Sequence, residues 1–108
     1  DILMMLQTTT PIVEGHPIKE YKGIVSAQSI IGANVLKDFM AGMRDFFGGR
    51  SKAYEKVYRQ AKEDALRELA EEAVKLGGNA IVGVRLDFES AGTGGMLMVA
   101  ASGTAVVI

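Results

Sequence analysis

The chain opens with two stretches that are rich in apolar, strand-forming residues. The first covers residues 2–8, and the second runs from about Ile18 to Ala27. Between them lie the segment 8–11, which ends in a proline, and a turn at residues 14–17. Gly, Pro and polar residues between apolar runs are typical of connections between strands, so two N-terminal strands are predicted.

Two helices are predicted in the middle of the chain. Apolar residues recur at helical spacings from Val35 to Phe47, after a possible cap at Asn34 and before Gly48-Gly49. A longer helix is expected from Ser51 onward, with Gly77-Gly78 as its stop. Its opposite face carries charges four residues apart, as in a solvated helix. The apolar stripe comprises Ala53, Val57, Ala61, Ala65, Leu66, Leu69, Ala73 and Leu76.

The last third of the chain predicts a β-hairpin around a glycine-rich loop at residues 91–95. Residues 80–89 alternate, which predicts Ala80, Val82, Val84, Leu86 and Phe88 on one face and Arg85, Asp87 and Glu89 on the other. The closing strand, Met96–Ile108, is different because it is apolar on both faces and only Ser102 and Thr104 interrupt it.

These elements predict a single α+β domain over residues 1–108, in the order β-β-α-α-β-β, with short hairpins at both ends. The sheet is expected to be antiparallel, with helices packed on one face. A strand with two apolar faces needs cover on both, and one short chain has few elements to supply it. The small residues of segment 100–105 suggest that another backbone approaches closely there. We therefore expect a homo-oligomer assembled through the closing strand.

Composition and charge narrow the classes of function. Of the 108 residues, 48% are apolar, which is high for a soluble domain and again indicates a partner surface. Twelve basic and thirteen acidic residues give a net charge of −1, which argues against a nucleic-acid or polybasic membrane-surface role. No apolar run reaches the roughly 18 residues of a membrane span. The sequence contains no cysteine, hence no disulfide and no thiolate.

Several motifs resemble those of the YbjQ-like proteins, a family associated with heavy-metal binding and of uncharacterised function. The resemblance covers essentially the whole chain, with Lys37 and Gly78 as mild departures from the family pattern. The motifs are Thr8–Pro11, Glu14-Gly15, Gly32–Asn34, Lys37–Phe39, Ala41–Asp45, Gly48–Ser51, Tyr54-Glu55, Gly78–Val84, Gly95–Val99 and Ser102–Val106. The resemblance implies a compact α+β subunit, a ring-shaped homo-oligomer (a pentamer) and a location in the bacterial cytoplasm.

The sequence contains few of the side chains that bind heavy metals. Soft metals favour thiolate or imidazole ligands, and the chain offers one histidine. His16 lies in the first turn with Glu14 two residues before it, so these two residues are the candidate metal ligands. An ordinary solvated histidine is the alternative. Methionine thioethers bind Cu(I), but the pairs Met40/Met43 and Met96/Met98 also suit core packing. A metal cofactor is therefore only weakly supported.

The turn Gly48-Gly49-Arg50-Ser51 is a candidate anion site. Two glycines precede a long helix whose first N–H groups and dipole attract an anion, and Arg50 adds a positive charge. Alternatively, Ser51 caps the helix and Arg50 pairs with Asp38 or Asp45. The spacing is not that of a phosphate-binding P-loop, and the glycines at 92, 94 and 95 suit a hairpin rather than a dinucleotide site.

No catalytic constellation is evident in the sequence. The preferred hypothesis is a non-enzymatic oligomeric module that binds an anion or a metal at subunit boundaries. The alternative is a small enzyme whose active site combines Arg44, Asp45, Arg50 and Tyr54 across an interface. No residue is assigned a catalytic role.

Overall fold

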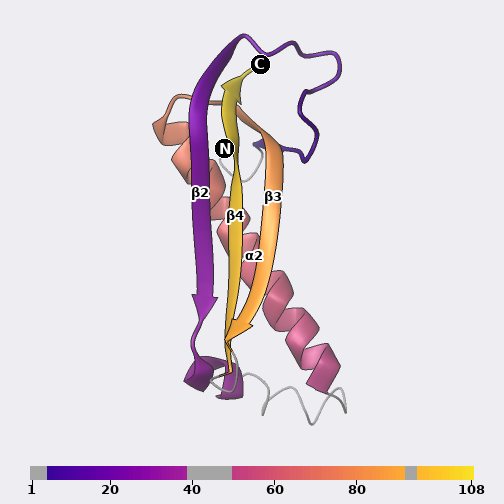
Figure 1. Cartoon of the computed structure of the whole chain (residues 1–108), viewed down its shortest axis with the longest axis vertical. Coiled ribbons are helices and arrows are strands. Elements are labelled where there is room, and N and C mark those ends of the chain that lie inside the picture. The colour runs from indigo at the N-terminus through magenta and orange to yellow at the C-terminus, as the bar shows by residue number, and fades with distance from the viewer. Residues whose placement is uncertain (1–4, 39–49, 92–94) are drawn as a thin grey trace.

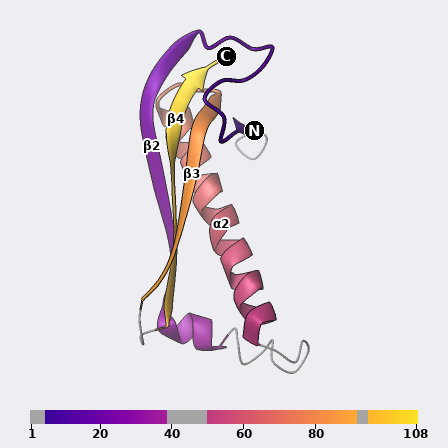
Figure 2. The ribbon, with the colours of Figure 1, turned by 45° about the vertical axis from the view of Figure 1, so that its right-hand side comes forward.

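A long helix covers one face of a curved, four-stranded sheet. The computed structural model describes the backbone of residues 5–38, 50–91 and 95–108, and the side chains of all of these except 50–54 and 91. Figures 1 and 2 show the helix α2 crossing one face of the sheet diagonally. The elements are β1 (Leu6–Gln7), β2 (Glu20–Ile31), α2 (Arg50–Lys75), β3 (Ala80–Ala91) and β4 (Met96–Val107).

The α+β class and the location of most elements are as predicted, although the bounds differ. The first strand is shorter than the predicted 2–8, and β2 begins and ends later than expected. Residues 33–38 are helical, and the remainder of that predicted helix lies outside the described residues. The helix α2 begins at Arg50, one residue before the expected start.

The sheet is mixed, so the predicted antiparallel sheet is wrong. Its strand order is β1-β3-β4-β2. The inner strand β4 is antiparallel to both neighbours, whereas β1 runs parallel to β3 with Leu6 opposite Ala80. The expected N-terminal hairpin is also wrong, because β1 and β2 lie at opposite edges (Figure 1). A tight hairpin needs a loop of about two to five residues, and residues 8–19, with two prolines, instead cross the end of the sheet.

A bulge in β3 changes which of its residues face the helix. The register between β3 and β4 shifts between Val82 and Arg85, and Gly83 has a φ of +62°, which favours glycine. Ile81 and Val84 consequently pack in the core under α2, whereas Val82 packs on the opposite face. The prediction that Val82 and Val84 share a face is therefore wrong, since simple alternation fails across a bulge.

The main core lies between α2 and the sheet. Ala61, Ala65, Leu69 and Ala73 of the helix are fully buried. The small alanine side chains let the helix lie close to the strands. Their partners in this core include Val25, Ile81, Val84, Val99, Ala101 and Ala105. The predicted helical stripe is thereby confirmed at these positions.

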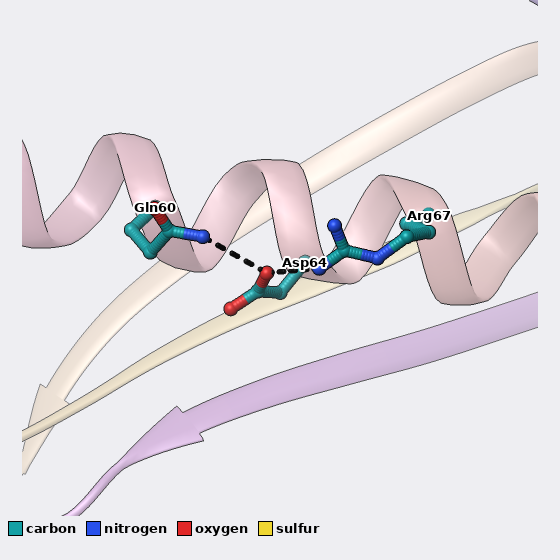
Figure 3. A network of polar contacts seen from close by, with 3 residues as sticks. All are labelled: Gln60, Asp64 and Arg67. Carbon is teal, nitrogen blue, oxygen red and sulfur yellow. Dashed lines mark hydrogen bonds and ion pairs between the residues drawn. The ribbon is translucent and has the colours of Figure 1, made fainter. Parts of the chain in front are cut away.

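The outer face of α2 is polar and its C-terminal end is capped as expected. Asp64 accepts hydrogen bonds from Gln60 (3.1 Å) and from Arg67 (Figure 3). Near the end of the helix, Lys75 donates to Glu72 at 2.9 Å, and this hydrogen bond raises the pKa of Lys75. Gly77 has a φ of +87°, which ends the helix. Among the described residues, no helix has the length and hydropathy needed to cross a membrane.

The small residues of β4 have an explanation within one chain. Ala101, Gly103 and Ala105 are buried on the side that faces α2. The inference that their size reflects a neighbouring subunit's backbone is therefore wrong at these three positions. Close packing against the chain's own β3 and α2 requires them to be small.

The sheet face opposite α2 is open over most of its length. Ile24 lies opposite Thr104, and Ile30 lies opposite Met98. Ile24 is 84% exposed and Ile30 is 56% exposed, although strand residues of this kind are usually covered. The folded chain is also elongated, at 50 × 23 × 21 Å, so it exposes more surface than a compact domain of its length.

Candidate functional site

Residues 8–19 cross the end of the sheet and are tied to it on both sides. At the start, Thr8 N–H donates to Ile81 O at 2.9 Å, and Gly83 N–H donates to Thr10 O at the same distance. At the end, Lys19 N–H donates to Val107 O at 2.7 Å. Figure 1 shows this segment as the indigo arch between the first strand and β2. Because both ends are tied to strands, the arch is held in a defined position.

A tight turn shapes the middle of this segment. His16 N–H donates to Val13 O at 3.0 Å, and Gly15 adopts a φ of +82° that an L side chain rarely takes. The turn rests on the sheet because Val13 and Ile18 pack against the buried cluster formed by Ala80, Val82 and Val106. The predicted turn at Glu14–Pro17 is thus confirmed, and its apolar neighbours anchor it.

The turn borders an open hollow of about 520 Å³. Its lining consists of residues 12–18 and Tyr21 of β2. This volume falls in the range of roughly 300–1,000 Å³ that is typical of small-molecule sites. Most side chains around it are apolar, and two of these apolar side chains are largely exposed to solvent. Ile12 is 62% exposed and Tyr21 is 68% exposed.

Both predicted metal-site residues, Glu14 and His16, line this hollow. The structure therefore brings them together with the aliphatic residues and the tyrosine that the sequence analysis did not single out. The sequence held a signal for this site, because the connection between the two predicted strands carries the adjacent apolar residues Ile12 and Val13 and two prolines. Partial burial of Ile18 and exposure of Ile12 depend on the path of the arch, which the sequence pattern does not specify.

The donor atoms at this turn do not fit a heavy-metal site within one chain. Glu14 and His16 supply one carboxylate and one imidazole, whereas soft metals favour several thiolate or imidazole ligands. The sequence has no cysteine and no second histidine. Over the described residues, no group of three or more His, Cys, Asp or Glu side chains is placed to hold a metal ion. A complete coordination shell would need donors other than those that the described residues place at this turn.

The methionine pairs are only partly described. Met96 and Met98 share the open face of β4, where Met96 is 38% exposed. Neither belongs to a buried core cluster. Met40 and Met43 lie outside the described residues.

The candidate anion site and the alternative enzyme site fall largely outside the described part of the chain. Gly48 and Gly49 are not described, and neither are the side chains of Arg50 and Ser51. The alternative active site depends on Arg44, Asp45, Arg50 and Tyr54. The first two of these residues lie outside the described ranges, as does the side chain of Tyr54. Both sites stay predictions.

Comparison with known proteins shows similarity along nearly the whole chain. The family model of the YbjQ proteins, described as "Putative heavy-metal-binding", matches residues 5–108. A UPF0145 protein of Caulobacter vibrioides (strain NA1000 / CB15N) is 57% identical over 105 residues, covering 96% of this chain and 100% of that protein. The UPF0145 protein of C. vibrioides strain ATCC 19089 / CIP 103742 / CB 15 matches to the same extent.

The fold also matches a crystal structure. A protein of unknown function of the DUF74 family, from Pediococcus pentosaceus ATCC 25745, is 25% identical and superposes with a TM-score of 0.63. The match covers 96% of this chain and 97% of that one. Because the family model matches residues 5–108 and a UPF0145 protein is 57% identical, the chain belongs to the YbjQ family, whose members include the UPF0145 proteins.

Proposed function

We propose that this protein is a non-enzymatic binding module that works as a homo-oligomer and holds a small ligand in the hollow lined by residues 12–18 and Tyr21. The observation that carries the proposal is the convergence of exposed apolar side chains and two titratable groups on one preformed hollow. Ile12 and Tyr21 remain exposed in the single chain, so a ligand that covers them removes apolar surface from water.

The rigid support of the hollow favours binding. The turn is fixed by the hydrogen bond from His16 to Val13, and Val13 and Ile18 are packed against the sheet. A ligand therefore meets a site that needs little ordering, which lowers the entropic cost of binding. Glu14 and His16 then provide polar groups that can orient it.

The open sheet face supports the proposed homo-oligomer. It carries Ile24 and Ile30, and in the described chain no strand pairs with the outer edge of β2. An unpaired edge strand with apolar neighbours is a surface that proteins usually cover. The resemblance to the YbjQ family supplies the expectation of a closed ring of five subunits in the bacterial cytoplasm. Metal binding is part of this proposal only as a site completed by several chains.

Ligand screening on the intact assembled protein tests the proposed function. We expect saturable binding of small molecules, mapped by backbone amide shifts to residues 12–21, with no chemical change in the bound compound. Tyr21→Ser should weaken that binding, because it removes the exposed ring from the hollow. Turnover of a bound compound would contradict the non-enzymatic proposal, and binding confined to other surfaces would contradict the choice of site.

A further inference from the structure

The hollow lined by residues 12–18 and Tyr21 carries one carboxylate, that of Glu14, among mostly apolar side chains. Among the lining residues, Glu14 carries a negative charge and none is lysine or arginine. The nearest lysines in sequence are Lys19 and Lys22, which are not part of the lining. Lys22 is also occupied, because its Nζ lies 2.8 Å from Glu20 Oε2. An anionic ligand would therefore meet the carboxylate of Glu14 without a compensating cation in the lining.

The aromatic residue at the rim favours the opposite charge. The ring of Tyr21 is largely exposed beside the hollow, and ring faces attract ammonium groups. A carboxylate and an aromatic ring next to aliphatic side chains are the components with which proteins hold organic cations. A hydrated metal ion would gain little from Ile12, Pro17 and Ile18, whereas the hydrocarbon part of an organic ligand would cover them.

We infer that the hollow binds small organic cations, that is, amines or ammonium compounds with an apolar body. The apolar body contacts Ile12, Ile18 and Tyr21, and the charged group lies on the Glu14 side. His16, which also lines the hollow, adds a hydrogen-bonding group. This inference rests on the proposed function, because it names the ligand class of the same site.

Three probes of similar size and different charge test it: benzylamine, benzyl alcohol and benzoate. Each is titrated into the intact assembled protein while the backbone amides of Gly15, His16 and Tyr21 are followed by NMR. We expect benzylamine to bind with a dissociation constant on the order of millimolar, as is usual for a fragment of this size. Its affinity should exceed that of benzyl alcohol by about two- to fivefold, the range for an exposed charge pair, and benzoate should bind most weakly.

Glu14→Gln is the decisive variant, and Glu71→Gln on the outer helix face is its control. Both remove one negative charge at an exposed position, but only Glu14 lines the hollow. In Glu14→Gln, the affinities for benzylamine and benzyl alcohol should become equal, whereas Glu71→Gln should keep the wild-type ratio.

The outcomes separate this inference from the proposed function. If all three probes shift the same amides with equal affinity, the hollow binds small molecules but the preference for cations is refuted. Loss of the preference in both variants would likewise refute the role of Glu14. If no probe shifts these amides, the hollow is closed or inert in the assembly, and the inference and the proposed site both fail.

Discussion

Gly103 of β4 and Ile81 of β3 lie so close that a methyl group on Gly103 would be 2.7 Å from Ile81 Cγ2. Real side chains almost never approach so closely, and Val82 O would lie at 3.2 Å from the same methyl group. Both residues are in the core under α2, next to the bulge at Gly83. Glycine at position 103 is therefore a requirement of the single chain's fold.

The contact predicts that Gly103→Ala destabilises the folded subunit by about 1–3 kcal/mol, as overpacking of a core does. Thermal or urea unfolding would measure it. The cost should be smaller in an Ile81→Ala background, because the clashing methyl group is then absent, and a double-mutant cycle gives the difference. Gly32→Ala is the matched control, since a methyl group there meets nothing within 4 Å. Equal costs in both Ile81 backgrounds would contradict the explanation.

The side-chain amide of Asn79 forms two hydrogen bonds with the backbone of Ile108, one as donor and one as acceptor. Ile108 N–H donates to Asn79 Oδ1 at 2.9 Å, and Asn79 Nδ2 donates to Ile108 O at 3.2 Å. Asn79→Ala should therefore lower the free energy of unfolding by about 1–2 kcal/mol, the net value of two hydrogen bonds. Asn79→Asp should stabilise no better than alanine, because an oxygen then faces the Ile108 carbonyl. A fully stable Asn79→Asp protein in chemical denaturation would refute this pairing.

The proposed assembly makes Ile24 the most informative surface position. The Ile24 side chain is 84% exposed in the single chain, so Ile24→Asp should leave the chain folded. If the open sheet face is the interface, burial of an unpaired carboxylate there costs several kcal/mol and the oligomer should dissociate. Light scattering and native mass spectrometry would show the change, with Glu71→Gln on the helix face as the control. An unchanged oligomer for Ile24→Asp, or a folded wild-type monomer at micromolar concentration, would exclude this interface.

Metal titrations test whether Glu14 and His16 are too few ligands for a tight heavy-metal site. We expect calorimetry with Zn²⁺, Cd²⁺ and Cu⁺ to find no stoichiometric site tighter than micromolar in dissociated subunits, since one imidazole and one carboxylate provide too few ligands. Weak binding at the turn should disappear in His16→Ala. A submicromolar site that survives His16→Ala would show that methionines or carboxylates hold the metal instead.

The predicted anion site before α2 depends on Arg50. Arg50→Ala should reduce the stabilisation by phosphate or sulfate, because it removes the positive charge beside the helix N-terminus. Melting temperatures at constant ionic strength, with and without the anion, would measure this effect. Arg59→Ala removes the same charge further along the helix and should respond to the anion as the wild type does. Equal responses in all three proteins would rule out an anion site at Arg50.

Local patterns along the chain were enough to predict the class of fold and the buried face of the helix. The spacing of Ala61, Ala65, Leu69 and Ala73 is independent of what covers it, since helical geometry alone places these residues on one stripe. Glycines at 77 and 78 marked the end of the helix for an equally local reason. The apolar pattern on both sides of residues 96–108 is only half explained within the chain, because one side of β4 packs under α2 and the other lies on the open face of the sheet.

Strand order, the bulge and the hollow, in contrast, depend on contacts between distant parts of the folded chain. Nothing local in residues 6–7 selects β3 rather than β2 as their neighbour, because backbone hydrogen bonds carry little sequence information. The bulge at Gly83 moved Val82 to the face opposite Val84, which alternation cannot anticipate. The hollow likewise depends on the path of residues 8–19 across the sheet end. That path brings Tyr21 beside Glu14 and His16. It depends on the packing of Val13 and Ile18 against the cluster of Ala80, Val82 and Val106, which is far away in the sequence.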